Sequence, residues 1–227
     1  MKKPSVISFL ITLLLAAAVC IHGGEPVIDK DGNPVKLREK YFIQPVKTKT
    51  NNGGGLVPAT TSILPPYCPL GVTQTILPDQ PGLPVSFTLP YVVEETDVLT
   101  SLVVNIEFKS NIWACNEFSK FWKVNETSSS ASEEPLILVG GTRREPNSWF
   151  MIEIAGEGPE ANTYKLTTST GTVGAVPGVW FNAPQLVLTK DNAKTVLVKF
   201  KKVEDVTTAT TSTTRVEKLG LRMFPFY

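Results

Sequence analysis

Cys68-Pro69-Leu70-Gly71-Val72-Thr73-Gln74 is the stretch of this sequence that decides the fold. It joins a cysteine to a short apolar run through a proline and a glycine, and Cys115 is the only other cysteine outside the N-terminal leader. If the two cysteines pair, the loop closed between them stabilises the fold by about 4 kcal/mol in the chain-entropy treatment. We expect this staple to hold the intervening segment, including a surface loop, in one conformation.

The N-terminus has the layout of a secretory signal peptide. Lys2-Lys3 is followed by an apolar run, Val6–Val19, and then by small residues that suit cleavage. We predict a signal peptide over residues 1–24, with its boundary between residues 18 and 24, and a secreted or vacuolar protein. A membrane anchor is the alternative, but the run is short for a bilayer. Cys20 leaves with the leader or stands at the new terminus, so Cys68 and Cys115 remain as an even pair in an oxidising compartment.

Charge and titratable residues argue against several classes of function. The formal net charge is +1 and no long run of one sign occurs, so neither nucleic acid nor a membrane is an expected partner. The single histidine, His22, lies at the leader boundary, which leaves nucleophilic catalysis without a base. Glu94-Glu95 and Glu133-Glu134 are sequence neighbours, not the facing carboxylates of a glycosidase. We therefore predict a protein that is not an enzyme and that uses no metal or cofactor.

After Pro26 the sequence consists of short apolar or alternating runs separated by Gly, Pro, Asn and Asp, a pattern that predicts an all-β domain. We place this domain at residues 25–203 and a Thr-rich C-terminal tail at residues 204–227. The predicted strands are 40–46, 71–77, 85–89, 102–108, 122–125, 136–139, 149–154, 164–166, 185–189 and 195–203.

Asn125-Glu126-Thr127 is a glycosylation sequon within a polar run. Asn125 is therefore the predicted glycosylation site, on a surface loop. Trp149 and Phe150 are predicted to lie in the core on one strand.

A set of motifs in this order resembles the plant Kunitz (soybean trypsin inhibitor-type) family over about residues 26–203. The resemblance implies a β-trefoil of twelve strands in three pseudo-repeats, a disulfide between Cys68 and Cys115, and a monomer that inhibits a protease through an exposed loop. A serine protease is the first expectation, with cysteine and aspartic proteases as alternatives. The motifs are 28–35 with 41–43, 68–74, 106–108 before Cys115, 140–141 before 148–150, 164–166 and 198–200.

Carried over residue by residue, the family's inhibitory loop falls at Tyr91, Val92, Val93 and Glu94, with the cleavable bond after Val92. Family members that inhibit trypsin carry Arg or Lys at the position of Val92. A valine there leaves the buried Asp of trypsin's pocket unpaired, at a cost of about 2–5 kcal/mol. We therefore predict that the chain is not a strong trypsin inhibitor and that its target accepts small aliphatic side chains, as an elastase-type pocket does.

Two departures from the family pattern predict a less ordered loop. Leu37 stands where the family has an Asn whose side chain supports the inhibitory loop. The family's second disulfide is absent, because Ser169 and Gly174 stand near its positions, so the segment 167–177 is predicted to be a mobile loop. Ordering such loops on binding lowers affinity.

Two alternatives stay open. Arg143 and Arg144, in the turn 140–146, could form a substitute docking loop, although a solvated dibasic pair is the default interpretation. The chain could also be a non-inhibitory trefoil with a storage, binding or signalling role. The Gln-x-Trp repeat of trefoil lectins is absent, which argues against sugar binding but not against the others.

Overall fold

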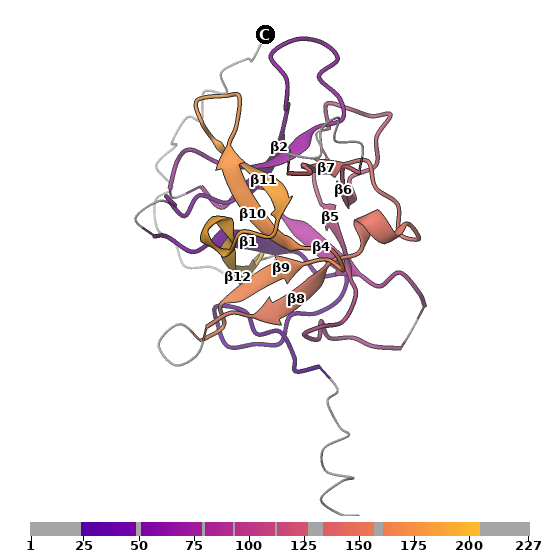
Figure 1. The fold of residues 1–227 in the computed structure, drawn as a ribbon. Helices are drawn as coiled ribbons and strands as arrows, with labels where there is room; N and C mark the ends of the chain where they lie inside the picture. Colours follow the sequence, from indigo (N-terminus) through magenta and orange to yellow (C-terminus); the bar gives the residue numbers. More distant parts are fainter. Residues whose placement is uncertain are drawn as a thin grey trace, which may run out of the picture.

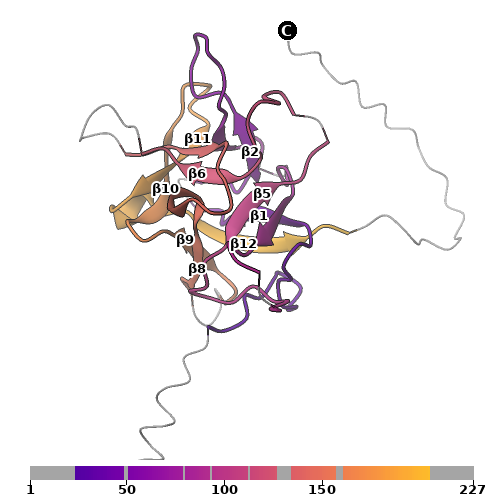
Figure 2. The ribbon, with the colours of Figure 1, turned by 90° about the vertical axis from the view of Figure 1, so that its right-hand side faces the viewer.

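The computed structural model describes residues 24–48, 51–78, 80–92, 94–111, 113–126, 134–156 and 161–204. Twelve β-strands lie within these ranges and form one hydrogen-bonded sheet (Figures 1 and 2). The predicted all-β class is confirmed. In chain order the strands are β1 (Tyr41–Pro45), β2 (Leu56–Ala59), β3 (Gly71–Gln74), β4 (Val85–Thr88), β5 (Asn105–Phe108), β6 (Trp122–Val124), β7 (Ile137–Val139), β8 (Met151–Ile154), β9 (Tyr164–Thr167), β10 (Thr172–Pro177), β11 (Pro184–Thr189) and β12 (Leu197–Lys202).

Six of these strands close a barrel. β1 pairs with β4 and β12, β4 with β5, and β9 with both β8 and β12, all antiparallel. A bridge between Val104 and Phe150 joins the start of β5 to the start of β8 and completes the ring. Closure matters because it leaves no unpaired strand edge in the barrel.

The remaining strands form three hairpins, β2–β3, β6–β7 and β10–β11, that contact one another. β3 pairs with β7 and with β11, and Leu136 bridges Val187. In Figure 1, β2, β7 and β11 lie above β8, β9 and β12 of the barrel. A six-stranded barrel capped by three mutually paired hairpins is a β-trefoil, with units β1–β4, β5–β8 and β9–β12, as predicted.

Aromatic side chains fill the core in a way that repeats with the three units. Phe87, Phe150 and Phe200 lie in, or directly before, the fourth strand of each unit and are fully buried. The ring of Phe200 meets Phe87 edge-on at 5.5 Å, and Phe150 meets Trp122 edge-on at 6.2 Å. Edge-to-face pairs stabilise the core beyond the area that they bury. The predicted burial of Phe150 is thereby confirmed.

The predicted strands correspond to all but two of those observed. β2 was not predicted because it contains Pro58 and follows a run of glycines. β10 was not predicted because Gly174 and Ala175 interrupt its apolar pattern. Pairing with a neighbour supplies what the local sequence lacks, since β2 pairs along its length with β3 and β10 with β11.

The prediction of a mobile loop over 167–177 is wrong. Thr167 ends β9, and residues 172–177 form β10, which is in register with β11 from Thr172↔Thr189 to Pro177↔Pro184. A Cβ atom at Gly174 would lie 2.6 Å from Cγ2 of Thr189 and 2.8 Å from the carbonyl oxygen of Lys194. Close packing against neighbouring residues thus orders this segment without a second disulfide.

The described residues include two short 3-10 helices, η1 (Pro146–Ser148) and η3 (Asn192–Lys194). Within the described ranges no helix combines the length and the apolar character needed to cross a bilayer. The predicted signal peptide, apart from Gly24, and the predicted tail beyond Glu204 lie outside the described residues.

Candidate functional site

The disulfide between Cys68 and Cys115 is present, with the two Cα atoms 6.0 Å apart. Cys115 is buried in the core, and Cys68 packs partly buried against it. The pair spans 47 residues that include β3, β4 and β5. It therefore ties a hairpin of the first unit to the second unit, and it braces the scaffold instead of contacting the predicted inhibitory loop.

The predicted inhibitory loop leaves the barrel at the end of β4 and returns at Asp97. Leu89 is buried, whereas Val92 is 98% exposed and Tyr91 and Glu94 are also exposed. Val93 lies outside the described residues. The loop thus carries an aliphatic side chain at its tip with almost its whole surface in solvent.

Tyr91 is held from the side by a neighbouring loop. Its ring meets the ring of Trp149 at 6.1 Å, and Nε1 of Trp149 donates a hydrogen bond to the carbonyl oxygen of Arg143 at 3.1 Å. Nη2 of Arg143 donates to the carbonyl oxygen of Leu89 at 3.2 Å. Trp149 is only partly buried, so its prediction as a core residue is wrong, and its ring covers the base of the loop instead.

The two sites that the sequence presented as alternatives therefore lie side by side. Arg143 contacts the predicted inhibitory loop, whereas Arg144 is exposed and makes no hydrogen bond to the described part of that loop. Arg143 thus contacts the predicted inhibitory loop, and the use of Arg143 and Arg144 as an alternative docking loop stays a prediction.

Leu37 supports the loop through its backbone. Its side chain packs partly buried against the core, while its N–H donates to the carbonyl oxygen of Thr96 at 2.8 Å. The next N–H, of Arg38, donates to the carbonyl oxygen of Phe87 at 2.9 Å. The N–H groups of residues 37 and 38 thus bond to the returning limb of the loop, at Thr96, and to strand β4 before the loop, at Phe87.

Asn125 lies directly after β6 and is half-buried, and its N–H donates to the carbonyl oxygen of Leu136 at 2.9 Å. Thr127 of the sequon lies outside the described residues.

A second candidate site, which sequence reasoning missed, lies beside the turn of the β10–β11 hairpin. Phe181 there is 85% exposed, and Val179 is also exposed. The side chains border a hollow of about 760 Å³, within the usual range for ligand pockets. The lining residues are Pro58, Ala59, Thr60, Leu70, Thr73, Ala114, Gly178, Val179, Trp180, Phe181, Ala183 and Gln185.

The polar groups of this hollow are uncharged. Oγ1 of Thr73 donates to Oε1 of Gln185 at 2.9 Å, and Nε2 of Gln185 donates to the carbonyl oxygen of Val72 at 2.9 Å. The signal in the sequence was the triplet Val179-Trp180-Phe181, three apolar residues between Pro177-Gly178 and Asn182 where a turn is normally polar.

The turn holds Phe181 in a costly backbone conformation. Phe181 and Asn182 have φ of 49° and 55°, in the left-handed region that bulky residues seldom adopt. The N–H of Gly178 donates to the carbonyl oxygen of Ala183, and the N–H of Ala183 donates to the carbonyl oxygen of Trp180. Backbone strain of this kind persists where surrounding bonds enforce it, and it is concentrated at functional sites.

Comparison with known proteins shows which family this chain resembles. Residues 27–202 match the legume Kunitz family, described as trypsin and protease inhibitor. Kunitz trypsin inhibitor 2 of Arabidopsis thaliana is 67% identical over 213 residues, which are 93% of this chain and 98% of that protein.

Two solved structures extend the comparison. A water-soluble chlorophyll protein from Brassica oleracea var. botrytis, solved with chlorophyll b, is 58% identical with a TM-score of 0.72, covering 79% of this chain and 99% of its own. Soybean trypsin inhibitor, solved in complex with porcine pancreatic trypsin, shares the fold at 24% identity with a TM-score of 0.63, over 79% of this chain and 100% of its own.

The matching family consists of inhibitors and binding proteins and not of enzymes, as the sequence led us to expect. Because the match extends over nearly the whole trefoil domain and one relative is similar over almost its full length, the chain belongs to the plant Kunitz family of protease inhibitors.

Proposed function

We propose that this protein is a protease inhibitor that inserts the loop 89–97 into the substrate cleft of its target, with Val92 in the specificity pocket. The observation that carries the proposal is the side chain of Val92, 98% exposed at the tip of a loop whose returning limb bonds to the N–H of Leu37 and whose departing limb bonds to the guanidinium group of Arg143. A loop already ordered before binding loses less conformational entropy when the complex forms.

Val92 determines the expected target. In a pocket with a buried carboxylate, as in trypsin, valine leaves the carboxylate without a partner. Binding is then weaker by about 2–5 kcal/mol than with an arginine at the same position. A small aliphatic pocket, as in elastase, accommodates it. We therefore expect an elastase-like serine protease as the target class, with cysteine and aspartic proteases as the alternatives to test.

The test is a titration of the purified protein against elastase, trypsin, chymotrypsin, a subtilisin-type, a papain-type and an aspartic protease. We expect inhibition of elastase and little inhibition of trypsin, and we expect Val92→Asp to remove it. Val179→Asp is the matched control, since it places the same charge on another exposed valine. Inhibition of no protease at micromolar concentration, or full potency in Val92→Asp, would refute the use of this loop.

A second function, binding of a chlorophyll-like pigment, is favoured by the hollow beside the β10–β11 turn. The hollow is lined by aromatic and aliphatic side chains without a formal charge, which suits a large, flat, apolar ring system. The chlorophyll protein of Brassica oleracea, at 58% identity, makes this ligand class the natural one to test. This function and inhibition use different loops and are compatible.

Pigment binding is tested by mixing the protein with chlorophyll b and separating bound from free pigment by size-exclusion chromatography with absorbance detection. We expect co-elution with the protein, and loss of co-elution in Trp180→Ala and in Val179→Asp. Val92→Asp is the control in this experiment, and we expect it to co-elute with the pigment as the wild type does. Equal co-elution in all variants would assign the pigment to some other surface.

We also propose that the protein is secreted or vacuolar as a glycosylated monomer. The proposal rests on the apolar leader in residues 1–24 and on the sequon at Asn125. N-terminal sequencing of the protein from its source should begin between residues 19 and 25, and deglycosylation should lower its mass unless Asn125 is replaced by Gln.

A further inference from the structure

The two limbs of the loop 89–97 are fixed by side chains that come from different parts of the chain. Lys36 precedes β1 in the first unit and reaches the limb that returns at Asp97. Arg143 precedes η1 in the second unit and reaches the limb that leaves at Leu89. The exposed tip at Val92 lies between these two attachments in the sequence.

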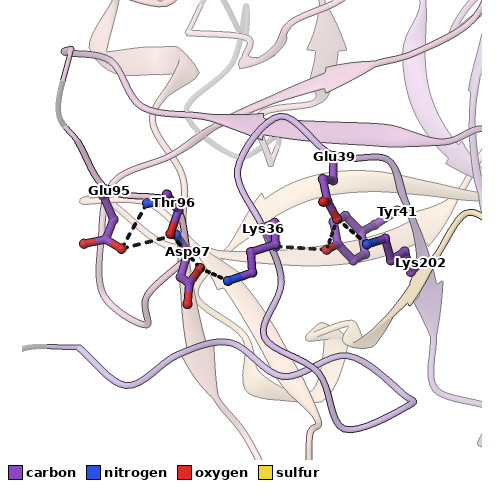
Figure 3. A network of polar contacts seen from close by, with 7 residues as sticks. All are labelled: Lys36, Glu39, Tyr41, Glu95, Thr96, Asp97 and Lys202. Atoms are coloured by element: carbon purple, nitrogen blue, oxygen red, sulfur yellow. Dashed lines mark hydrogen bonds and ion pairs between the residues drawn. The ribbon is translucent and has the colours of Figure 1, made fainter.

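The returning limb is organised around Asp97. Nζ of Lys36 lies 2.5 Å from Oδ1 of Asp97, and the same oxygen accepts a hydrogen bond from the hydroxyl of Thr96 at 3.0 Å. Oε1 of Glu95 turns back to accept from the N–H groups of Thr96 and Asp97, both at 3.2 Å. Figure 3 shows Glu95, Thr96 and Asp97 on one side of Lys36. Only Glu94 of the acidic pair is thus left to face a partner.

Lys36 is itself held on the other side by the barrel. Its N–H donates to the hydroxyl of Tyr41 at 2.9 Å, and that hydroxyl donates to Oε2 of Glu39 at 3.2 Å. Glu39 forms an ion pair with Lys202 of β12 (Figure 3). The ammonium group that binds Asp97 is therefore carried on backbone that is tied to two barrel strands.

The departing limb has a different attachment. The guanidinium group of Arg143 binds the carbonyl oxygen of Leu89, while its own carbonyl oxygen accepts from the indole N–H of Trp149. The Trp149 ring then contacts Tyr91, the residue directly before Val92. Arg143 and Trp149 thus hold the backbone and the side chain that precede the tip.

We propose that Lys36 and Arg143 are positioning residues that hold the loop 89–97 in its binding conformation. This inference rests on the proposed inhibitory function for its consequence in affinity, but its structural part, order in the free loop, can be measured without any protease. Hydrogen bonding lowers the pKa of Asp97 below its ordinary value, with Lys36 as the main cause, which agrees with a close ion pair at neutral pH.

The two contacts are placed to order the loop and not to stabilise the fold. The side chains of Lys36 and Asp97 are 42% and 22% exposed, and exposed ion pairs contribute little to global stability. Removing such a contact should therefore leave global unfolding nearly unchanged while it loosens the loop. This combination separates a positioning role from a general structural one.

The test uses the full chain labelled with ¹⁵N. In Lys36→Met we expect the amides of Leu37 and Val98 to exchange about two- to five-fold faster, because their bonds flank the lost ion pair. In Arg143→Ala we expect about a five-fold increase in the population of the open loop, seen as lower order parameters at Tyr91 and Val92. Lys40→Met and Arg144→Ala are the matched controls on exposed neighbours, and Lys36→Arg should restore wild-type exchange.

The outcomes separate the two proposals. Faster loop motion together with weaker inhibition, at an unchanged unfolding midpoint, supports both. Faster loop motion with unchanged inhibition supports the positioning role and removes the loop from the inhibitory function. Wild-type exchange and order parameters in Lys36→Met and Arg143→Ala, or the same changes in Lys40→Met and Arg144→Ala, would overturn the positioning role whatever the inhibition.

Discussion

Two exposed loops of this molecule present apolar side chains, and they are built differently. The loop 89–97 exposes the aliphatic side chain of Val92 between limbs fixed by hydrogen bonds and an ion pair. The turn 177–183 offers Val179, Trp180 and Phe181 beside a hollow lined by uncharged side chains. A projecting aliphatic side chain suits a pocket on a partner, whereas aromatic groups around a hollow suit a ligand that enters this chain. Exposure of an apolar residue therefore says little about its partner until its neighbours are known.

The largest expected effect is a gain of trypsin inhibition in Val92→Arg. An arginine at the tip would pair with the buried carboxylate of trypsin and recover about 2–5 kcal/mol, a tightening of roughly thirty to several thousand fold. The measurement is the inhibition constant against trypsin. Val179→Arg, on the other loop, should gain nothing, and an equal gain there would erase the distinction between the two loops.

The disulfide should matter more for the hollow than for the loop. Removing it in Cys68→Ala/Cys115→Ala should lower the free energy of unfolding by about 2–5 kcal/mol, measured by urea denaturation. Leu70 and Ala114 line the hollow and lie close in sequence to the two cysteines, so pigment binding should weaken as well. The loop 89–97 is attached to other residues and should keep its inhibition wherever the variant is folded. Loss of inhibition with pigment binding retained would reverse this assignment.

The sequence predicted the scaffold well because its determinants are local or strongly patterned. Alternating apolar runs predicted most of the strands, and an ordered set of motifs such as Cys68–Gln74 implied the trefoil. β2 and β10 escaped prediction because Pro58 and Gly174 break the pattern, and their order comes from pairing and close packing.

The candidate sites were predicted less completely, because contacts between distant residues decide them. The position of the proposed inhibitory loop rests on the motif before Tyr91. No pattern could show that Arg143 contacts Leu89, 54 residues away, or that Lys36 meets Asp97, 61 residues away. The hollow was missed although Val179-Trp180-Phe181 is conspicuous for a turn, because its other wall comes from residues 58–73 and Ala114.

At the β10–β11 turn we expect a substitution to raise the free energy of unfolding, by less than removal of the disulfide lowers it. Phe181 has φ of 49° and buries little surface, so Phe181→Gly should relieve backbone strain and raise the free energy of unfolding by up to about 1 kcal/mol. The same variant should bind pigment more weakly because it loses an aromatic face. Val92→Gly is the control, since Val92 has no such φ and glycine there brings only added flexibility. Destabilisation by Phe181→Gly, measured by thermal unfolding, would mean that the phenyl ring packs more than its exposure indicates.

The smallest effect is a difference in pH dependence between the two loops. The pKa of Asp97 lies below its ordinary value of 3.8, chiefly because of the hydrogen bond from Lys36. The carboxylate therefore holds the returning limb at every pH above about 4, and this contribution is lost as the pH falls through the lowered pKa. Glu95, Thr96 and Lys36 are the other polar groups at that limb.

Amide exchange at Leu37 and Val98, corrected for intrinsic rates, should stay constant from pH 7 to about 4 and accelerate below it. In Asp97→Asn the exchange should already be fast at pH 7 and should show no such step. The lining of the hollow contains no titratable side chain among its described residues, so pigment binding should show no step over the same range. A step in Asp97→Asn at the same pH would assign the titration to another carboxylate, with Glu95 the next to test because it binds the same backbone.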